Sequence, residues 1–261
     1  MAESKGSDTK EQDPPTAEGE DEFEQDNGTL KWTTHKCGGD VPSPRSGHSL
    51  TVLGGAAYLF GGLGEGGSSV DADGLEVFGP TNEVFYCRLE AAGSRSAMRW
   101  ERCSCGGEAP LPRWGHTATV ISKKEFVVIG GFHSDTNRFN DVHIFDTQKN
   151  MWIQPLETIT DFTPRGNHIS RKTGGGGGSA SPAPRGGHTT TLVGTSLVVF
   201  GGYGGMGYAR RDFNDVAVFD VEAQDWVKMA NIQGKPPEAR SGHSASVHKE
   251  ESIFYFGGWN A

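Results

Sequence analysis

The sequence predicts an all-β protein in which one sheet unit is repeated along the chain. Three observations support this fold class. A motif of the form Arg-x-Gly-His occurs four times, and two short apolar runs follow each copy. The second run ends in a Gly-Gly pair that begins 13 or 14 residues after the histidine in every copy. A tryptophan closes each of the first three units, and without the longer loops the period is roughly 50 residues, within the range of repeat proteins.

Residues 1–29 are expected to be a disordered acidic tail. They contain ten Asp and Glu residues against two Lys, which accounts for nearly all of the chain's formal net charge of −9. A segment with so few apolar side chains cannot offset the entropy of ordering. We interpret it as a solubilising tail, with an interaction arm for a basic partner as the alternative.

Composition also excludes several function classes. The N-terminus lacks the basic start and apolar stretch of a secretory signal, and no run approaches the roughly 18 apolar residues of a membrane span. The nearly neutral remainder of the chain does not favour nucleic-acid binding, which needs a basic face. We therefore expect a cytoplasmic protein, with the nucleus as the alternative, and no membrane or nucleic-acid partner.

Residues 30–261 are predicted to form the repeat domain. Trp32 lies 13 residues before Arg45, the same offset that separates Trp100 from Arg113. The segment near 30–34 is therefore predicted to be the last strand of a unit whose first three strands do not precede it. The complete units are expected at about 45–104, 113–156 and 185–231, and a partial one at 240–261.

Within each unit, paired apolar runs predict antiparallel strands. Strands are expected at 50–53, 57–60 and 83–89 in the first unit, and the Gly54-Gly55 pair predicts a hairpin turn. In the second unit they are expected at 117–121, 126–129, 141–145 and 151–154.

A flexible insertion is predicted at 157–183, because Gly174 to Gly178 is a glycine run with Ser, Ala and Pro after it. Arg165 opens a similar motif in this insertion, but no apolar strand follows it. We therefore take Arg185 as the true start of the third unit.

The repeated residues are expected to be structural, because a function at one site would not need four copies. The arginines are predicted to tie each unit to a neighbour through Asp141, Asp215 or backbone carbonyls. The histidines are predicted to form hydrogen bonds at unit edges, the glycines to sit at tightly packed or positive-φ positions, and the tryptophans to fill the core. The structural motif residues are Arg45, His48, Gly61, Gly62, Arg113, His116, Gly130, Gly131, Asp141, Trp152, Arg185, His188, Gly201, Gly202, Asp215, Trp226, Arg240, His243, Gly257 and Gly258.

These motifs resemble the kelch-repeat family, and the resemblance covers residues 31–261. It implies a β-propeller whose blades are four-stranded antiparallel sheets around a central channel. Three complete units and two end pieces predict a partial propeller of about four blades. A closed four-bladed ring and a ring shared by two copies remain as alternatives, and the chain could also be an incomplete piece of a larger kelch protein.

Antiparallel order predicts that the loops after each Gly-Gly pair and the connections between units share one face. Insertions in repeat proteins tend to collect on the binding face. The loops at 132–139 and 203–213 contain aromatic and arginine residues, which dominate binding energy at interfaces. Phe139 and Phe213 are expected to pack inside the sheet units instead. The candidate partner-binding residues are Phe132, His133, Arg138, Tyr203, Met206, Tyr208, Arg210 and Arg211.

The sequence contains no arrangement that indicates a metal, a cofactor or a catalytic site. Cys103 and Cys105 are separated by one residue rather than the two to four of zinc pairs, and we expect all four cysteines to be free thiols. Kelch enzymes include oxidases and sugar epimerases, but the Tyr86-Cys87 pair has no histidine cluster beside it. The sequence therefore favours a non-enzymatic scaffold or adaptor that binds other proteins, with a kelch-type enzyme as the alternative.

Overall fold

The computed structural model describes residues 36–70, 76–89, 98–155, 180–205, 207–228 and 232–260. The chain divides into two units, residues 1–34 and 35–261, and the description below concerns the second. The predicted acidic tail at 1–29, the predicted strand at 30–34, most of the predicted insertion at 157–183, and Met206 lie outside the described residues.

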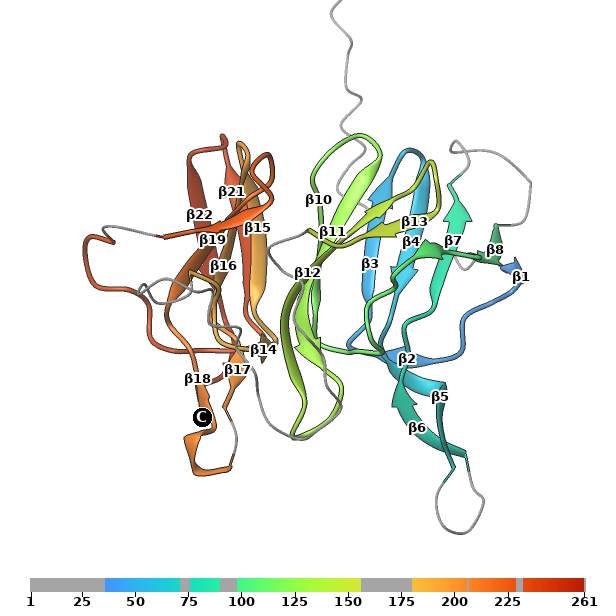
Figure 1. The fold of residues 1–261 in the computed structure, drawn as a ribbon, viewed down its shortest axis with the longest axis horizontal. Coiled ribbons are helices and arrows are strands. Elements are labelled where there is room, and N and C mark those ends of the chain that lie inside the picture. The colour runs from blue at the N-terminus through green and yellow to red at the C-terminus, as the bar shows by residue number, and fades with distance from the viewer. Residues whose placement is uncertain are drawn as a thin grey trace, which may run out of the picture. The chain divides into compact units, whose positions relative to one another are not determined.

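Four antiparallel sheets, which we call repeat sheets 1 to 4, follow one another along the chain (Figure 1). Sheet 1 contains, in order across the sheet, β3 (Ser49–Leu53), β4 (Ala56–Phe60), β7 (Val84–Arg88), β8 (Arg99–Arg102) and β1 (Gly38–Gly39). Sheet 2 contains β10 (Thr117–Val120), β11 (Glu125–Phe132), β12 (Arg138–Asp146), β13 (Met151–Ile153) and β9 (Gly106–Gly107). Sheet 3 contains β15 (Thr189–Val193), β16 (Ser196–Phe200), β19 (Val216–Asp220) and β20 (Asp225–Val227). Sheet 4 contains β21 (Ser244–His248) and β22 (Ser252–Phe256).

The strands form at the positions that the apolar runs predict, because apolar side chains in these runs are buried by the sheet's neighbours. In β3 the pattern Ser-Leu-Thr-Val-Leu alternates, whereas β11 and β16 are apolar on both faces and lie in the interior of their sheets. The register places Ser49 opposite Phe60 in sheet 1 and Thr189 opposite Phe200 in sheet 3. Equivalent positions of the repeats therefore have equivalent partners.

Two short parallel pairings add a strand to the outer edge of sheet 1 and of sheet 2, and the sequence gives no sign of them. Gly38–Gly39 pairs with Arg99–Trp100, and Gly106–Gly107 pairs with Met151–Trp152. After its fourth strand, the chain of sheet 1 thus crosses to the outer edge of sheet 2. Glycine is required there because a Cβ atom on Gly107 would lie 2.1 Å from the carbonyl oxygen of Trp152.

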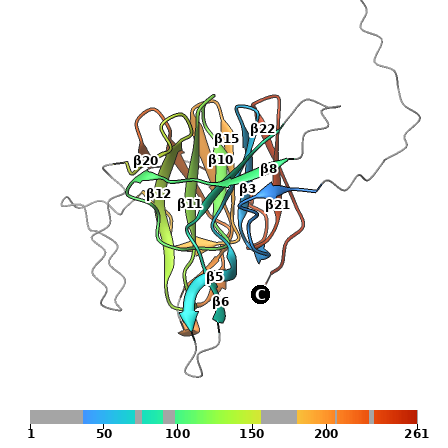
Figure 2. The same ribbon diagram turned by 90° about the vertical axis from the view of Figure 1, so that its right-hand side faces the viewer.

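Two smaller sheets extend beyond the repeat sheets on one side of the unit, which we call the ribbon side (Figures 1 and 2). One contains β2 (Arg45–Ser46), β5 (Leu63–Val70) and β6 (Glu76–Pro80). The other contains β14 (Arg185–Gly186), β17 (Tyr203–Gly204) and β18 (Arg211–Asp212), with a 3-10 turn η2 (Gly207–Ala209) between its last two strands. Segments expected as plain loops after the Gly-Gly pairs form β-ribbons in their described residues, since β5 pairs with β6 and β17 with β18. In the loop expected at 132–139, β11 ends at Phe132 and β12 begins at Arg138, so only 133–137 form the connecting turn.

The apolar core lies between neighbouring repeat sheets rather than inside any one of them. The first strands are in contact in the order β3, β10, β15, β21. One cluster joins sheet 1 to sheet 2 and includes Phe60, Phe126 and Trp152. A second joins sheet 2 to sheet 3 and includes Ile129, Leu197 and Trp226. Each sheet is therefore stabilised mainly by its neighbours, as expected for repeat proteins.

Within the described residues, no helix has the length and apolar character needed to cross a membrane.

Candidate functional site

The repeat arginines fasten the strands of their own sheet. Arg113 donates to the carbonyl oxygens of Leu111 (2.9 Å) and Gly130 (3.0 Å), and both of its terminal nitrogens bind the carboxylate of Asp141 at 2.6 and 2.9 Å. Arg185 makes the same set of contacts with Ala183, Gly201 and Asp215. The predicted partner types are thus correct, but the carboxylates belong to the same repeat as the arginine and not to a neighbouring one.

Both arginines and the Asp141 carboxylate are largely buried, whereas the Asp215 side chain is about half exposed, and in each pair the two charges compensate each other. Burial alone would raise the pKa of Asp141, but the Arg113 guanidinium and a hydrogen bond from His143 hold this pKa well below its usual range. The pKa of Asp215 is lowered in the same way by Arg185. Both carboxylates are therefore held in the charged form by their arginine partners.

The repeat histidines join each repeat to the one before it. His116 Nε2 lies 2.9 Å from Ser49 Oγ, and His243 Nε2 lies 2.9 Å from Thr189 Oγ1. Burial, followed by the neighbouring arginine charge, lowers the pKa of both His116 and His188 to about 3. These histidines are neutral at physiological pH and are held between sheets. Within the described residues, no group of three His, Cys, Asp or Glu side chains is placed to hold a metal ion.

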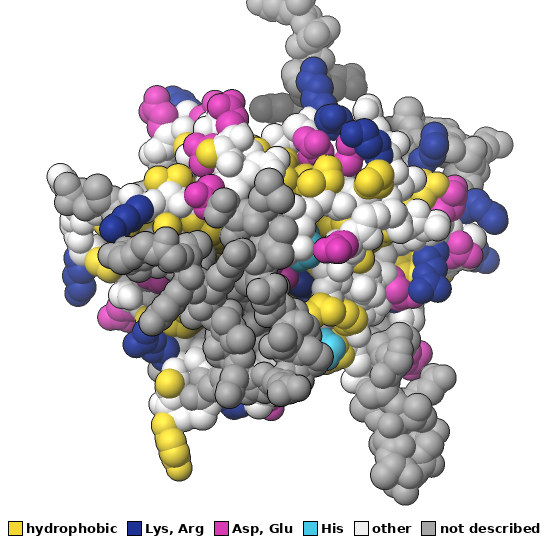
Figure 3. Space-filling view, viewed as in Figure 1, with side chains coloured by type: hydrophobic (Ala, Val, Ile, Leu, Met, Phe, Trp, Pro, Cys, Tyr) yellow, Lys and Arg dark blue, Asp and Glu magenta, His cyan; other side chains and the backbone are white. Residues whose placement is uncertain are grey.

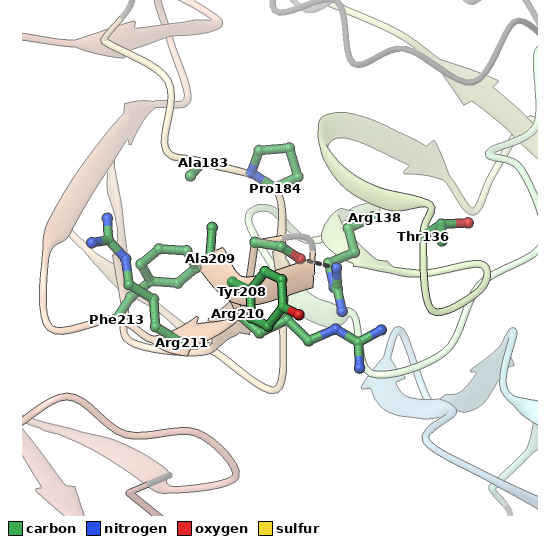
Figure 4. Close-up of a pocket in the computed structure, with 10 residues that line it drawn as sticks. Thr136, Arg138, Ala183, Pro184, Tyr208, Ala209, Arg210, Arg211 and Phe213 are labelled. Carbon is green, nitrogen blue, oxygen red and sulfur yellow. Dashed lines mark hydrogen bonds between the residues drawn. The ribbon is translucent and has the colours of Figure 1, made fainter.

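A pocket of about 570 Å³ lies on the ribbon side, between the tip of β11–β12 and the β17–η2–β18 ribbon (Figure 4). The ten residues that line it are Thr136, Arg138, Ala183, Pro184, Gly205, Tyr208, Ala209, Arg210, Arg211 and Phe213. The Asn140 amide donates to the Pro182 carbonyl at 2.9 Å, so the third strand of sheet 2 fixes the segment that contains Ala183 and Pro184. The pocket thus lies where two successive repeats meet.

Three arginines give this pocket a positive charge, and none of the described residues that line it is a carboxylate. Arg138 is buried and donates to the Gly205 carbonyl across the pocket floor (Figure 4). Burial first, and then the charge of Arg210, lowers the pKa of Arg138. Because two arginine charges repel each other in a partly buried site, an anionic group placed between them would be favoured.

Aromatic rings surround these arginines. The Arg138 guanidinium carbon lies 5.5 Å from the Phe132 ring centre and 5.6 Å from that of Tyr203. Arg211 lies 5.5 Å from the Phe213 ring centre. Tyr208, by contrast, extends fully into solvent from η2. The rings restrain two of the arginines, and Tyr208 remains available for contact with a partner.

The predicted partner-binding residues divide into buried and exposed groups. Phe132 and Arg138 are buried, Tyr203 is half-buried, and His133, Tyr208, Arg210 and Arg211 are exposed. Phe139 and Phe213 are buried, as expected, and pack against the guanidinium groups of Arg113 and Arg185, both at 4.2 Å. Sequence reasoning missed Thr136, Ala183, Pro184 and Ala209, although Pro184 stands next to the repeat arginine and its position could have indicated the pocket wall.

Charge on the face drawn in Figure 3 is mixed, with Lys and Arg side chains interspersed among Asp and Glu. The four cysteines are free thiols in the structure.

Comparison with known proteins agrees with this architecture. A family model described as the KLHDC2/KLHL20/DRC7 Kelch-repeats domain matches residues 77–261. The F-box/kelch-repeat protein At1g51550 of Arabidopsis thaliana is 32% identical over 237 residues, which are 88% of this chain and 43% of that protein. Acyl-CoA-binding domain-containing protein 6 of Oryza sativa subsp. japonica is 31% identical over 229 residues, which are 87% of this chain and 30% of that protein. The chain thus spans less than half the length of either relative.

A solved structure, that of YjhT, shares the fold at a TM-score of 0.53 and 17% identity, over 82% of this chain and 59% of that one. The repeated Arg-x-Gly-His and Gly-Gly motifs, the sheets that they organise and the family model that covers most of the sequence lead to the same conclusion: the chain belongs to the kelch-repeat domain family, with a β-propeller-type fold.

Proposed function

We propose that this chain is a non-enzymatic scaffold that binds an acidic segment of a partner protein on its ribbon side. The observation that carries the proposal is the pocket between the tip of β11–β12 and the β17–η2–β18 ribbon. Arg138, Arg210 and Arg211 meet there, and the other lining residues that the structure describes are uncharged. In this proposal the repeat sheets form a partial propeller of about four blades that supports the ribbons.

The physical chemistry of the pocket supports an anionic ligand. Hydrogen bonds from arginine to a carboxylate are about twice as strong as neutral ones and are directional. Arg138 is already ordered by the Gly205 carbonyl and two rings, so less side-chain entropy is lost when a ligand binds. Tyr208 offers a large, exposed ring beside the cations, and tyrosine and arginine are enriched at binding hot spots.

A scaffold role also agrees with where similar segments occur. One relative is named as an F-box/kelch-repeat protein and the other as an acyl-CoA-binding domain-containing protein. The present chain matches only part of each of them. We propose that this chain likewise contributes the recognition surface. The charge-compensated pair of Arg113 and Asp141 and the buried, neutral state of His116 and His188 support a role without catalysis.

The proposal is tested by selecting peptides from a random phage-displayed library on the purified chain and measuring the affinity of a selected peptide by fluorescence polarisation. We expect enrichment of Asp- and Glu-rich sequences and an affinity that falls as salt is raised. The Arg210→Glu variant is expected to weaken binding at least about tenfold, since it removes a charge-assisted bond and adds repulsion.

Arg88→Glu is the matched control, because Arg88 is an exposed arginine at the end of β7, outside the pocket lining. It makes the same charge change and should leave the affinity within about twofold. Selection of peptides without acidic enrichment, or equal losses for the two variants, would refute the proposed site.

A further inference from the structure

Successive repeats are joined by a directional chain of backbone hydrogen bonds. The amide of Gly115 donates to the carbonyl of Gly47, Gly187 to Gly115, and Gly242 to Gly187, each at 2.8 Å. These four glycines are the third residues of the four Arg-x-Gly-His motifs, and all have φ between 63° and 65°. Each repeat therefore uses its amide toward the repeat before it and its carbonyl toward the repeat after it.

The side chains of the repeats follow the same direction. The repeat histidine reaches the hydroxyl residue that follows the histidine of the previous repeat, at 2.9 Å for His116 to Ser49 and 3.1 Å for His188 to Thr117. Its ring also packs on the last residue of the previous repeat's second strand. The centroids are 5.0 Å apart for Phe60 and His116 and 5.3 Å apart for Phe200 and His243.

Strand faces are assigned in the same way. Thr119 Oγ1 on β10 donates to the Thr190 carbonyl on β15, and Tyr58 on β4 packs toward Phe126 on β11. Counted from the first residue of a repeat's first strand, positions one, three and five and their cross-strand partners thus face the next sheet. Positions two and four face the previous sheet. Every repeat has a start face and an end face, and the two are complementary.

The start face of sheet 1 is exposed in the structure. Its histidine, His48, is exposed, whereas His116, His188 and His243 are buried. The even positions of β3 are Leu50 and Val52, whose exposed fractions are 58% and 59%. An apolar strip with a histidine beside it is therefore open to solvent.

The end face of sheet 4 is exposed as well. Phe256 occupies the position of Phe60 and Phe200, which pack on the next repeat's histidine, yet 81% of its surface is exposed. Phe254 on the same face is 63% exposed, and Ser244, the hydroxyl residue that follows His243, is exposed too. At each internal junction the end face supplies the glycine carbonyl, and the start face of the next repeat supplies the glycine amide that donates to it.

We propose that the end face of sheet 4 binds the start face of sheet 1 in a second copy of this chain, head to tail. The Gly242 carbonyl accepts the Gly47 amide, the Ser244 hydroxyl bonds to His48 Nε2, and Phe256 packs on the His48 ring. Leu50 and Val52 then cover Phe254.

A second copy is the occupant because the three junctions inside the chain already show this contact in detail. The contact joins two different surfaces, so two copies either close a ring through two such contacts or extend further. Among the described strands β22 pairs only with β21. An exposed edge strand is a template for pairing, which adds a reason for association.

The test is the mass of the full chain in solution, measured by sedimentation velocity up to about 100 μM, where a micromolar Kd is detectable. We expect a concentration-dependent species heavier than the monomer. Phe256→Asp should disable the end face and Leu50→Asp the start face, and each variant alone should be monomeric. A 1:1 mixture of the two should form a dimer, because one intact end face and one intact start face remain.

Phe78→Asp serves as the matched control, since Phe78 is an exposed aromatic residue on β6 and lies on neither face. It should associate like the unmodified chain, and circular dichroism should show that all three variants remain folded. A chain that is monomeric at every concentration, single variants that still associate, or a mixture that stays monomeric would each overturn the proposal. None of these outcomes depends on whether acidic peptides bind the pocket.

Discussion

The Nε2 atom of His188 lies 3.1 Å from the hydroxyl oxygen of Thr117, which belongs to the preceding repeat. The same hydroxyl lies 2.7 Å from that of Thr190. Thr117→Val removes both interactions and leaves the buried imidazole without this partner, so we expect the free energy of unfolding to fall by about 1–3 kcal/mol. Urea denaturation followed by tryptophan fluorescence measures the change. Thr136→Val, at an exposed threonine, should change it by less than about 0.5 kcal/mol.

Stability should decrease when the pH falls below about 6.5, before any carboxylate is protonated. The pKa of His116 and of His188 is about 3 in the folded chain, so between this value and the ordinary pKa near 6.5 only the unfolded chain binds these protons. Each histidine is expected to remove roughly 1–2 kcal/mol between pH 7 and pH 5. The urea midpoint measured at half-unit pH intervals should show this slope, and His188→Gln should reduce it. A midpoint that is constant from pH 7 to pH 5 would contradict the buried neutral state.

The buried arginine of sheet 2 should matter far more than its counterpart in sheet 4. Arg113→Met leaves the buried carboxylate of Asp141 without its guanidinium, and removing one member of a buried ion pair costs about 3–5 kcal/mol. The contacts of Arg240 are weaker, because its hydrogen bonds go to the neutral carbonyls of Glu238 and Gly257 in an exposed setting. Arg240→Met is therefore expected to cost about 1 kcal/mol. Equal losses in thermal or urea denaturation would be evidence against the ordering.

The first glycine of each of the first three Gly-Gly pairs should not accept a side chain. Gly201 has φ of 67°, and a Cβ atom there would lie 2.7 Å from the Arg240 carbonyl oxygen. Gly194 has a similar φ of 58° but has open space around it. Alanine at either position incurs about 1–2 kcal/mol of backbone strain, and Gly201→Ala should lose clearly more because the two sheets must also separate. Comparing the two variants by urea denaturation isolates the packing contribution.

The repeat sheets were predictable because the fold reuses one set of offsets. The strands 49–53 and 56–60 agree with the expected 50–53 and 57–60 within a residue, since apolar runs and the Gly54-Gly55 turn determine them locally. The ribbon β5–β6 was not predictable, because it pairs a segment rich in Gly and Ser through its backbone and has no apolar alternation.

The candidate site was predictable only in part. Aromatic and arginine residues indicated the loops that form the pocket. The sequence could not show that Phe132 is the last residue of β11 and Arg138 the first of β12, nor that both side chains are buried there. The sequence placed Arg113 and Asp141 in one predicted unit, but it led us to expect that the arginine ties this unit to a neighbour, whereas the two side chains pair within their own repeat.

The glycine chain from Gly47 to Gly242 has an evolutionary consequence. Every link joins a glycine amide to a glycine carbonyl at the same length. If the segment between Gly115 and Gly187 were duplicated in tandem, each copy could therefore form the same hydrogen bond with the repeat before it and the repeat after it. Lineages could therefore lengthen or shorten such a protein by whole modules, without a compensating substitution at either new joint.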